Sequence, residues 1–333
     1  MSSPLRTASL LSTCCLAGIA AGASPSLGQP EVPLASASQP KQPLSPATPT
    51  PPSKPATPIT LPDADHGPYA TAVLLSESAA LVPGAVSMLA VHFTIAPHWH
   101  TYWNGRSDTG FPFKAEWVLP AGFEIAGPLQ WPAPKRYISP GDILDHVYED
   151  SVSILVPVRV PASAQAGDKV TISAQLTWLV CKSACVFENG DVSVTLPIAA
   201  AGSVPAPSGD AGAFATARAR LPVPIESAGA AVSARIADSH LLIEAAGTER
   251  LEFYPLAKSV PTPFILKDGA ADRQRLSVSL GESTDAEGNP RRVQGVIMLR
   301  MAGKPATASD AATPARTSYF SIDLAMPDSN TQP

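Results

Sequence analysis

The sequence predicts an all-β fold, and three observations support this class. The 333 residues include 37 prolines, only 15% of residues are charged, and the apolar residues occur in short runs of valine, isoleucine and leucine broken by glycine or proline. A helix-rich enzyme would need fewer prolines and more charge. The length is enough for about two domains. We expect a β-sandwich followed by a second, smaller β-sandwich.

Residues 1–23 have the pattern of a secretory signal peptide. Arg6 gives a weakly positive start, an apolar stretch follows, and Ala21-Gly22-Ala23 is a small-residue cleavage site. We expect a periplasmic or otherwise exported protein that is soluble after cleavage, in a compartment where disulfides form. Thr13-Cys14 fits a lipoprotein box poorly, so lipid anchoring is the lesser alternative.

Residues 24–65 are rich in proline, serine and alanine, with 12 prolines between residues 24 and 62. A segment with almost no large apolar side chain cannot bury enough surface to offset the entropy of ordering. We expect a semi-extended, disordered linker.

The first folded domain is predicted over residues 66–200, and it holds all five tryptophans. Turn signals such as Pro83-Gly84 and Pro140-Gly141 separate strand-like runs at the spacing of a β-sandwich. The expected strands are Thr71–Leu75, Val86–Ile95, Phe113–Leu119, Ser153–Val160, Val170–Val180 and Val192–Ile198.

A linker at residues 201–212 precedes the second domain, predicted over residues 213–326, and a polar tail at 327–333. The domain begins with a short helix near residues 213–220. Its expected strands are Val232–Ile236, Leu241–Ala245, Leu251–Tyr254, Leu276–Leu280, Val296–Met301 and Tyr319–Leu324.

The stretch from Val170 to Ile198 holds the two cysteines that remain after signal cleavage, Cys181 and Cys185. Apolar and polar residues alternate on both sides of them, which is typical of half-buried strands. Facing residues of an antiparallel pair lie about 4.5 to 5.5 Å apart at Cα, within disulfide range. The sequence therefore predicts a hairpin whose two thiols can bond.

This spacing leaves three functions open. The first is reversible thiol–disulfide exchange, and the second is a structural disulfide, which would stabilise little because the closed loop is short. The third is a zinc or copper site, because His98 and His100 would share one face of a strand and could join Cys181 and Cys185.

Other classes of function find little support. The net charge of −5 and the absence of basic runs exclude a nucleic-acid footprint. Four carboxylates after Pro140-Gly141 could serve acid–base hydrolysis, but we expect solvated loop charge there, with His146 at the surface. These carboxylates are Asp142, Asp145, Glu149 and Asp150. Neither a Ser-His-Asp elbow nor a phosphate loop or dinucleotide motif accompanies them.

Several motifs together resemble the N-terminal periplasmic domain of the DsbD family, especially its ScsB-like branch. They are the segment from His98 to Trp117, residues 130–134 (QWPAP), and Trp178-Leu179-Val180-Cys181 with Cys185. The resemblance implies an immunoglobulin-like sandwich that passes electrons from a membrane-embedded partner to periplasmic thioredoxin-fold proteins, a chemistry used in cytochrome c biogenesis. Cys181 and Cys185 match the catalytic redox pair of the family, and no cofactor is expected.

Two departures qualify this resemblance. The chain lacks the membrane and thioredoxin-like domains of the family, so we expect a separate membrane electron donor. If active, the chain would be a component of a protein-disulfide reductase. Members of the family also shield the redox pair with a cap loop that carries an aromatic side chain. The stretch that would align with this loop, Pro140 to His146, offers only Ile143 and Leu144. We expect Tyr102, Tyr148 and Trp178 as further residues lining the site.

Overall fold

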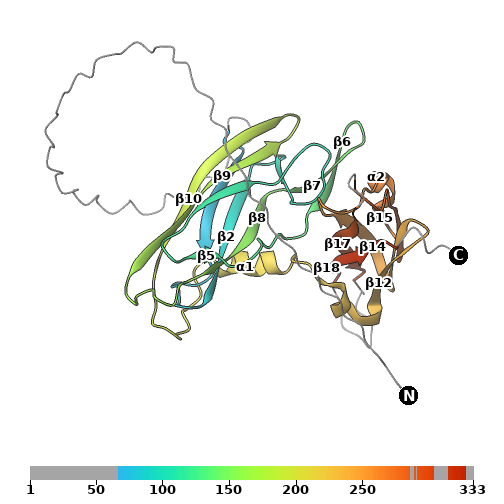
Figure 1. Ribbon diagram of the computed structural model, residues 1–333. Coiled ribbons are helices and arrows are strands. Elements are labelled where there is room, and N and C mark those ends of the chain that lie inside the picture. The colour runs from blue at the N-terminus through green and yellow to red at the C-terminus, as the bar shows by residue number, and fades with distance from the viewer. Residues whose placement is uncertain (1–66, 286–288, 290, 304–313, 328–333) are drawn as a thin grey trace, which may run out of the picture. The chain divides into compact units, whose positions relative to one another are not determined.

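The computed structural model describes residues 67–285, 289, 291–303 and 314–327. The predicted signal peptide, the proline-rich linker and residues 328–333 of the tail lie outside the described residues. The all-β prediction is confirmed, because strands dominate the described chain and form several mainly antiparallel sheets (Figure 1).

The first β-sandwich consists of two antiparallel sheets. One sheet has the order β1-β2-β8-β5, and the other has the order β10-β9-β3-β7-β6, with β4 also paired to β9. In chain order these strands are β1 (Ala70–Ser76), β2 (Val86–Ile95), β3 (His100–Tyr102), β4 (Lys114–Val118), β5 (Glu124–Ile125), β6 (Lys135–Ser139), β7 (Ile143–Tyr148), β8 (Ser151–Arg159), β9 (Lys169–Cys181) and β10 (Cys185–Pro197).

Alternation along β9 places its apolar side chains in the core. Ile172, Leu176 and Val180 are each at most 1% exposed, whereas Gln175 and Thr177 face outward. Because successive side chains in a strand point to opposite faces, this period-2 pattern fixes which face of β9 meets the opposite sheet. Cys181 follows Val180 and therefore lies on the outer face of its sheet.

The sequence prediction missed one part of this sandwich. We expected residues 141–150 to be a solvated loop, but Ile143–Tyr148 form the inner strand β7. Asp145 is 3% exposed and His146 is 1% exposed, so the surface assignment of both was wrong. A separate loop supplies partners for these polar side chains: Thr109 donates two hydrogen bonds to Asp145, and His146 Nδ1 donates one to the Arg106 carbonyl.

Helix α1 (Ala211–Arg218) matches the short helix predicted near residues 213–220 and lies on the outer face of the first sandwich. Phe214 and Ala217 pack against Ala90 of β2 and Leu155 of β8. We therefore propose that the first domain extends through this helix, and that the second begins after Arg220.

The second β-unit also has two sheets. One has the order β11-β18-β17-β14-β15, and the other has the order β12-β13-β16. The six strands expected here are all present. The strands are β11 (Val223–Pro224), β12 (Val232–Ala237), β13 (His240–Ala245), β14 (Thr248–Pro255), β15 (Ala270–Ala271), β16 (Arg275–Ser279), β17 (Arg292–Met301) and β18 (Arg316–Ala325). A 3₁₀ turn (Ile225–Ala231) and the single-turn helix α2 (Ile265–Asp268) connect them.

Within the described residues, no helix is long and apolar enough to cross a membrane.

Candidate functional site

The two cysteines lie opposite each other at the tip of the β9–β10 hairpin. The two strands are paired without interruption from Pro197↔Lys169 to Cys185↔Cys181, and the Cα atoms of the cysteines are 4.1 Å apart. A disulfide joins Cys181 and Cys185, with Lys182, Ser183 and Ala184 as the turn between them.

The two sulfur-bearing residues differ sharply in exposure. Cys181 is 3% exposed, because β9 is an inner strand flanked by β3 as well as β10. Cys185 is exposed, because β10 is the edge strand of the same sheet. Cys185 is therefore the cysteine of the pair that a second protein can reach.

Tyr102 is the side chain that holds the buried sulfur. Its hydroxyl donates a hydrogen bond of 3.0 Å to Cys181 Sγ and lies 3.8 Å from Cys185 Sγ. Burial raises the pKa of Tyr102 above its usual value. The phenol therefore keeps its proton at neutral pH and remains able to donate to sulfur.

A loop that follows β3 positions this tyrosine. Thr109 Oγ1 lies 3.3 Å from the Tyr102 hydroxyl and donates a 2.6 Å hydrogen bond to Asp145 Oδ2, while the Thr109 backbone N–H donates to Asp145 Oδ1 at 3.0 Å. Because the threonine proton goes to the carboxylate and the single proton of Tyr102 goes to Cys181 Sγ, the approach of the two hydroxyl oxygens is a polar contact between Thr109 and Tyr102. The buried Asp145 thus fixes the loop from the far side.

Gly110 allows the same loop to lie flat on the tyrosine ring. A Cβ atom at this position would be 2.0 Å from Tyr102 Cε1 and 2.1 Å from Cζ, which no side chain can accommodate without moving the ring. Glycine is required here for close approach, a role that the sequence pattern does not reveal.

His100 lies beside Cys181 and starts strand β3. The two residues are in register between β3 and β9, and His100 is 3% exposed. Its ring contacts Tyr137 at 4.4 Å and Tyr102 at 5.5 Å between centroids. Burial lowers the pKa of His100 more than the negative charges of Asp145 and Glu149 raise it. The imidazole is therefore uncharged at neutral pH.

A cavity of about 490 Å³ borders the disulfide. Its walls come from β3, the 103–113 loop, the β6–β7 hairpin and the cysteine turn. The lining residues are His100, Tyr102, Thr109, Tyr137, Ser139, Pro140, Ile143, Asp145, Cys181, Lys182, Ser183, Ala184 and Cys185. Tyr137 of β6 is an aromatic lining residue that packs against the cluster containing Cys181, and the sequence reasoning missed it because it sought the cap after Pro140.

The other expected lining residues occupy different places. Tyr102 and Ile143 border the cavity, whereas Leu144 is buried in β7. Tyr148 is 1% exposed and donates its hydroxyl proton to the Pro132 carbonyl. Trp178 points into the sandwich core and donates to Glu188 Oε2 at 3.0 Å.

The geometry does not assemble the alternative metal site. His98 was expected to share a strand face with His100, but it lies in a turn before β3, is exposed and has a φ of 68°. This expectation was therefore wrong. Across the described stretches of chain, no group of three or more His, Cys, Asp or Glu side chains could hold a metal ion.

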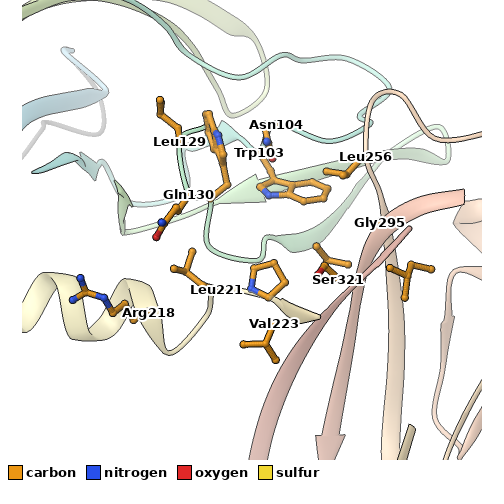
Figure 2. Close-up of a pocket in the computed structure, with 14 residues that line it drawn as sticks. Trp103, Asn104, Leu129, Gln130, Arg218, Leu221, Val223, Leu256, Gly295 and Ser321 are labelled. Atoms are coloured by element: carbon orange, nitrogen blue, oxygen red, sulfur yellow. The ribbon is translucent and has the colours of Figure 1, made fainter. Parts of the chain in front are cut away.

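A second cavity, of about 570 Å³, lies away from the cysteines. Figure 2 shows side chains of both β-units around it, among them Trp103 and Gln130 from the first and Leu256 and Ser321 from the second. Its walls are mainly apolar, and neither cysteine borders it. The disulfide therefore borders the smaller cavity and not this one.

Comparison with known proteins assigns the first sandwich. Residues 71–197 match the family described as "Thiol:disulfide interchange protein DsbD, N-terminal", and no curated protein matches the chain. The crystal structure of the N-terminal periplasmic domain of ScsB from Proteus mirabilis is 15% identical and covers 80% of this chain and 97% of its own, with a TM-score of 0.45. BcpA*(D312A), the major pilin subunit of Bacillus cereus, is 9% identical over 78% of this chain and 67% of its own, with a TM-score of 0.25. Because both TM-scores are below 0.5, the domain assignment depends on the family match.

Proposed function

Residues 71–197 form a DsbD N-terminal-like domain, and from this premise we propose that the chain is a thiol–disulfide exchange module whose working pair is Cys181 and Cys185. One observation carries the proposal. An exposed cysteine, Cys185, is bonded to a buried cysteine, Cys181, whose sulfur already has a hydrogen-bond donor, the Tyr102 hydroxyl. This asymmetry suits a pair in which one sulfur meets the partner and the other leaves.

The oxidised pair would accept electrons in two displacements. A thiolate of the partner attacks Cys185 Sγ, the intramolecular disulfide breaks, and its electron pair goes to Cys181 Sγ as a thiolate. The Tyr102 hydroxyl, 3.0 Å away, stabilises this thiolate. A second thiolate of the partner then attacks the mixed disulfide at the partner's own sulfur, releases Cys185 as a thiolate and leaves the partner oxidised.

The same groups serve the reverse reaction. Cys185 thiolate attacks the disulfide of an oxidised partner, and one partner sulfur leaves as a thiolate. Cys181 then attacks Cys185 Sγ, which restores the internal disulfide and expels the second partner sulfur. A lower pKa of Cys181 makes it a better leaving group in the first direction and a weaker nucleophile in the second. Tyr102 therefore sets the balance between the two directions.

Partners and location follow as parts of the same proposal. The N-terminal signal pattern supports export to the periplasm, where the chain would work as a soluble module. The DsbD N-terminal domain supports thioredoxin-fold proteins on one side of the transfer and a membrane electron donor on the other. No cofactor enters either displacement, because the two sulfurs carry both electrons.

A redox titration of the full chain in glutathione buffers tests the proposal. Exchange-active disulfides lie above about −300 mV, whereas structural disulfides lie below it. We expect the Cys181–Cys185 pair to titrate above this value and to equilibrate with a reduced thioredoxin-fold protein. A disulfide that stays oxidised at potentials below about −300 mV, or that no thioredoxin-fold protein reduces, would instead favour an adaptor with a structural disulfide.

A further inference from the structure

We propose that Phe111 and Phe187 form the surface on which the redox partner docks, an inference that rests on the proposed exchange function. Phe187 is 72% exposed and Phe111 is 39% exposed. Their rings contact each other, with centroids 5.7 Å apart and planes inclined by 37°. Single exposed apolar residues are ordinary, but two exposed aromatic rings in contact with each other are typical of an interaction site.

The aromatic pair lies beside the accessible sulfur. Cys185 and Phe187 are two residues apart in β10, so they point to the same face about 7 Å apart along the strand. Val186 and Glu188 point the other way, where Glu188 accepts hydrogen bonds from the backbone of Tyr69 and from Trp178.

The second ring comes from the loop that organises the buried sulfur. Phe111 directly follows Gly110, which lies on the Tyr102 ring, and Thr109, which binds Asp145. The loop is therefore held at its base, and the docking surface is continuous with the redox site. A partner that presses on Phe111 contacts the segment that positions Tyr102.

Access to the disulfide defines the kind of partner. Because Cys181 is buried, an incoming sulfur must reach Cys185 from the exposed side of β10, where Phe187 lies. The turn adds Ser183 and Ala184, and Lys182 is its single charge. The surface therefore fits a folded protein whose reactive cysteine lies in an apolar surface. A small thiol reductant needs access only to Cys185 Sγ, so contact with the two phenylalanine rings should not raise its rate of reduction.

The test compares a protein reductant with a small one. Full-length oxidised Phe187→Ala and Phe111→Ala would be reduced by reduced thioredoxin and, separately, by dithiothreitol, with rates followed from the loss of the disulfide. Phe264→Ala is the matched control, because Phe264 is 58% exposed and lies before α2 in the second β-unit. We expect Phe187→Ala to lower the thioredoxin rate by about 10- to 100-fold, since buried aromatic anchors dominate interfaces. The dithiothreitol rate should stay within about twofold, and Phe187→Leu should recover part of the loss.

Each other result has a definite meaning. Equal thioredoxin rates for the wild type and Phe187→Ala would overturn the docking surface and leave the exchange function intact. A rate that falls with both reductants would overturn it too, because the ring would then act on the sulfur chemistry. Self-association of the wild type that Phe187→Ala abolishes would identify a second copy as the occupant. A wild type that reacts with dithiothreitol alone would contradict the exchange function itself.

Discussion

Tyr102→Phe is the substitution that isolates the hydrogen bond to the buried sulfur. It removes one oxygen atom and leaves the ring, so the close contact with Gly110 is kept. The lost bond is 3.0 Å long and lies in a buried setting. A hydrogen bond to a charged group contributes about 1.5 to 3 kcal/mol.

That energy converts directly into two measurable quantities. At about 1.4 kcal/mol per pKa unit, the pKa of the Cys181 thiol should rise by about 1 to 2 units in the reduced protein. At about 30 mV per 1.4 kcal/mol, the reduction potential should fall by about 30 to 60 mV, because the reduced form loses its stabilisation. The full shift in potential appears above the thiol pKa, where Cys181 is a thiolate.

Thiolate absorbance against pH gives the pKa, and glutathione buffers give the potential. Tyr137→Phe is the matched control, because Tyr137 lines the same cavity and its hydroxyl does not bond either sulfur among the described contacts. The control should match the wild type in both measurements. If Tyr102→Phe also matches the wild type, the hydroxyl does not stabilise the thiolate and the assigned role of Tyr102 is refuted.

Three further predictions concern the framework of the site. Gly110→Ala should push the Tyr102 ring aside, which would destabilise the fold by about 1 to 3 kcal/mol in denaturant titrations and shift the Cys181 pKa in the same direction as Tyr102→Phe; a wild-type pKa would contradict this. Burial lowers the pKa of His146 to about 4, so the unfolded chain binds the proton more tightly than the folded protein does. The free energy of unfolding should therefore be at its full value above about pH 6.5 and fall by about 3 kcal/mol towards pH 4. His146→Leu should flatten that part of the profile, and an unchanged slope would show that other groups cause it. Glu188→Ala removes the acceptor of two backbone N–H groups and of the Trp178 indole, and it should cost about 1 to 3 kcal/mol in the same titrations; an unchanged denaturation midpoint would count against it.

The sequence was informative where one local pattern decides the structure. Alternation along residues 170–180 and 192–198 predicted β9 and β10, and the three residues between Cys181 and Cys185 predicted their pairing. These features depend on period and spacing within one hairpin, which neighbours in sequence determine. The strands of the second β-unit were predicted for the same reason.

The β6–β7 hairpin was missed because its stability comes from distant residues. Asp145 and His146 look like loop residues, and only the 106–109 segment, more than 35 residues earlier in the chain, makes their burial acceptable. The dipeptide Pro140-Gly141 did indicate a turn. It was interpreted as the start of a loop, whereas the turn joins two short strands that pair from Ser139↔Ile143 to Lys135↔Val147.

The roles of His100 and Tyr102 depend on a sheet neighbour that sequence spacing does not reveal. Strand β3 has only three residues and carries no alternation long enough to detect. Its pairing with β9 places His100 opposite Cys181 and Tyr102 beneath the sulfur. The sequence suggested a metal role for His100, and only the register between the strands shows it as a neutral neighbour of the disulfide.

Trapping of a mixed disulfide tests most directly whether Cys185 meets the partner while Cys181 resolves. The measurement uses Cys181→Ser and Cys185→Ser with a thioredoxin variant that keeps only its exposed cysteine, activated as a mixed disulfide with a small aromatic thiol. The account predicts rapid formation of a stable protein–protein disulfide by Cys181→Ser and at least about tenfold slower formation by Cys185→Ser, whose remaining sulfur is buried. Equal rates, or faster trapping by Cys185→Ser, would contradict the account.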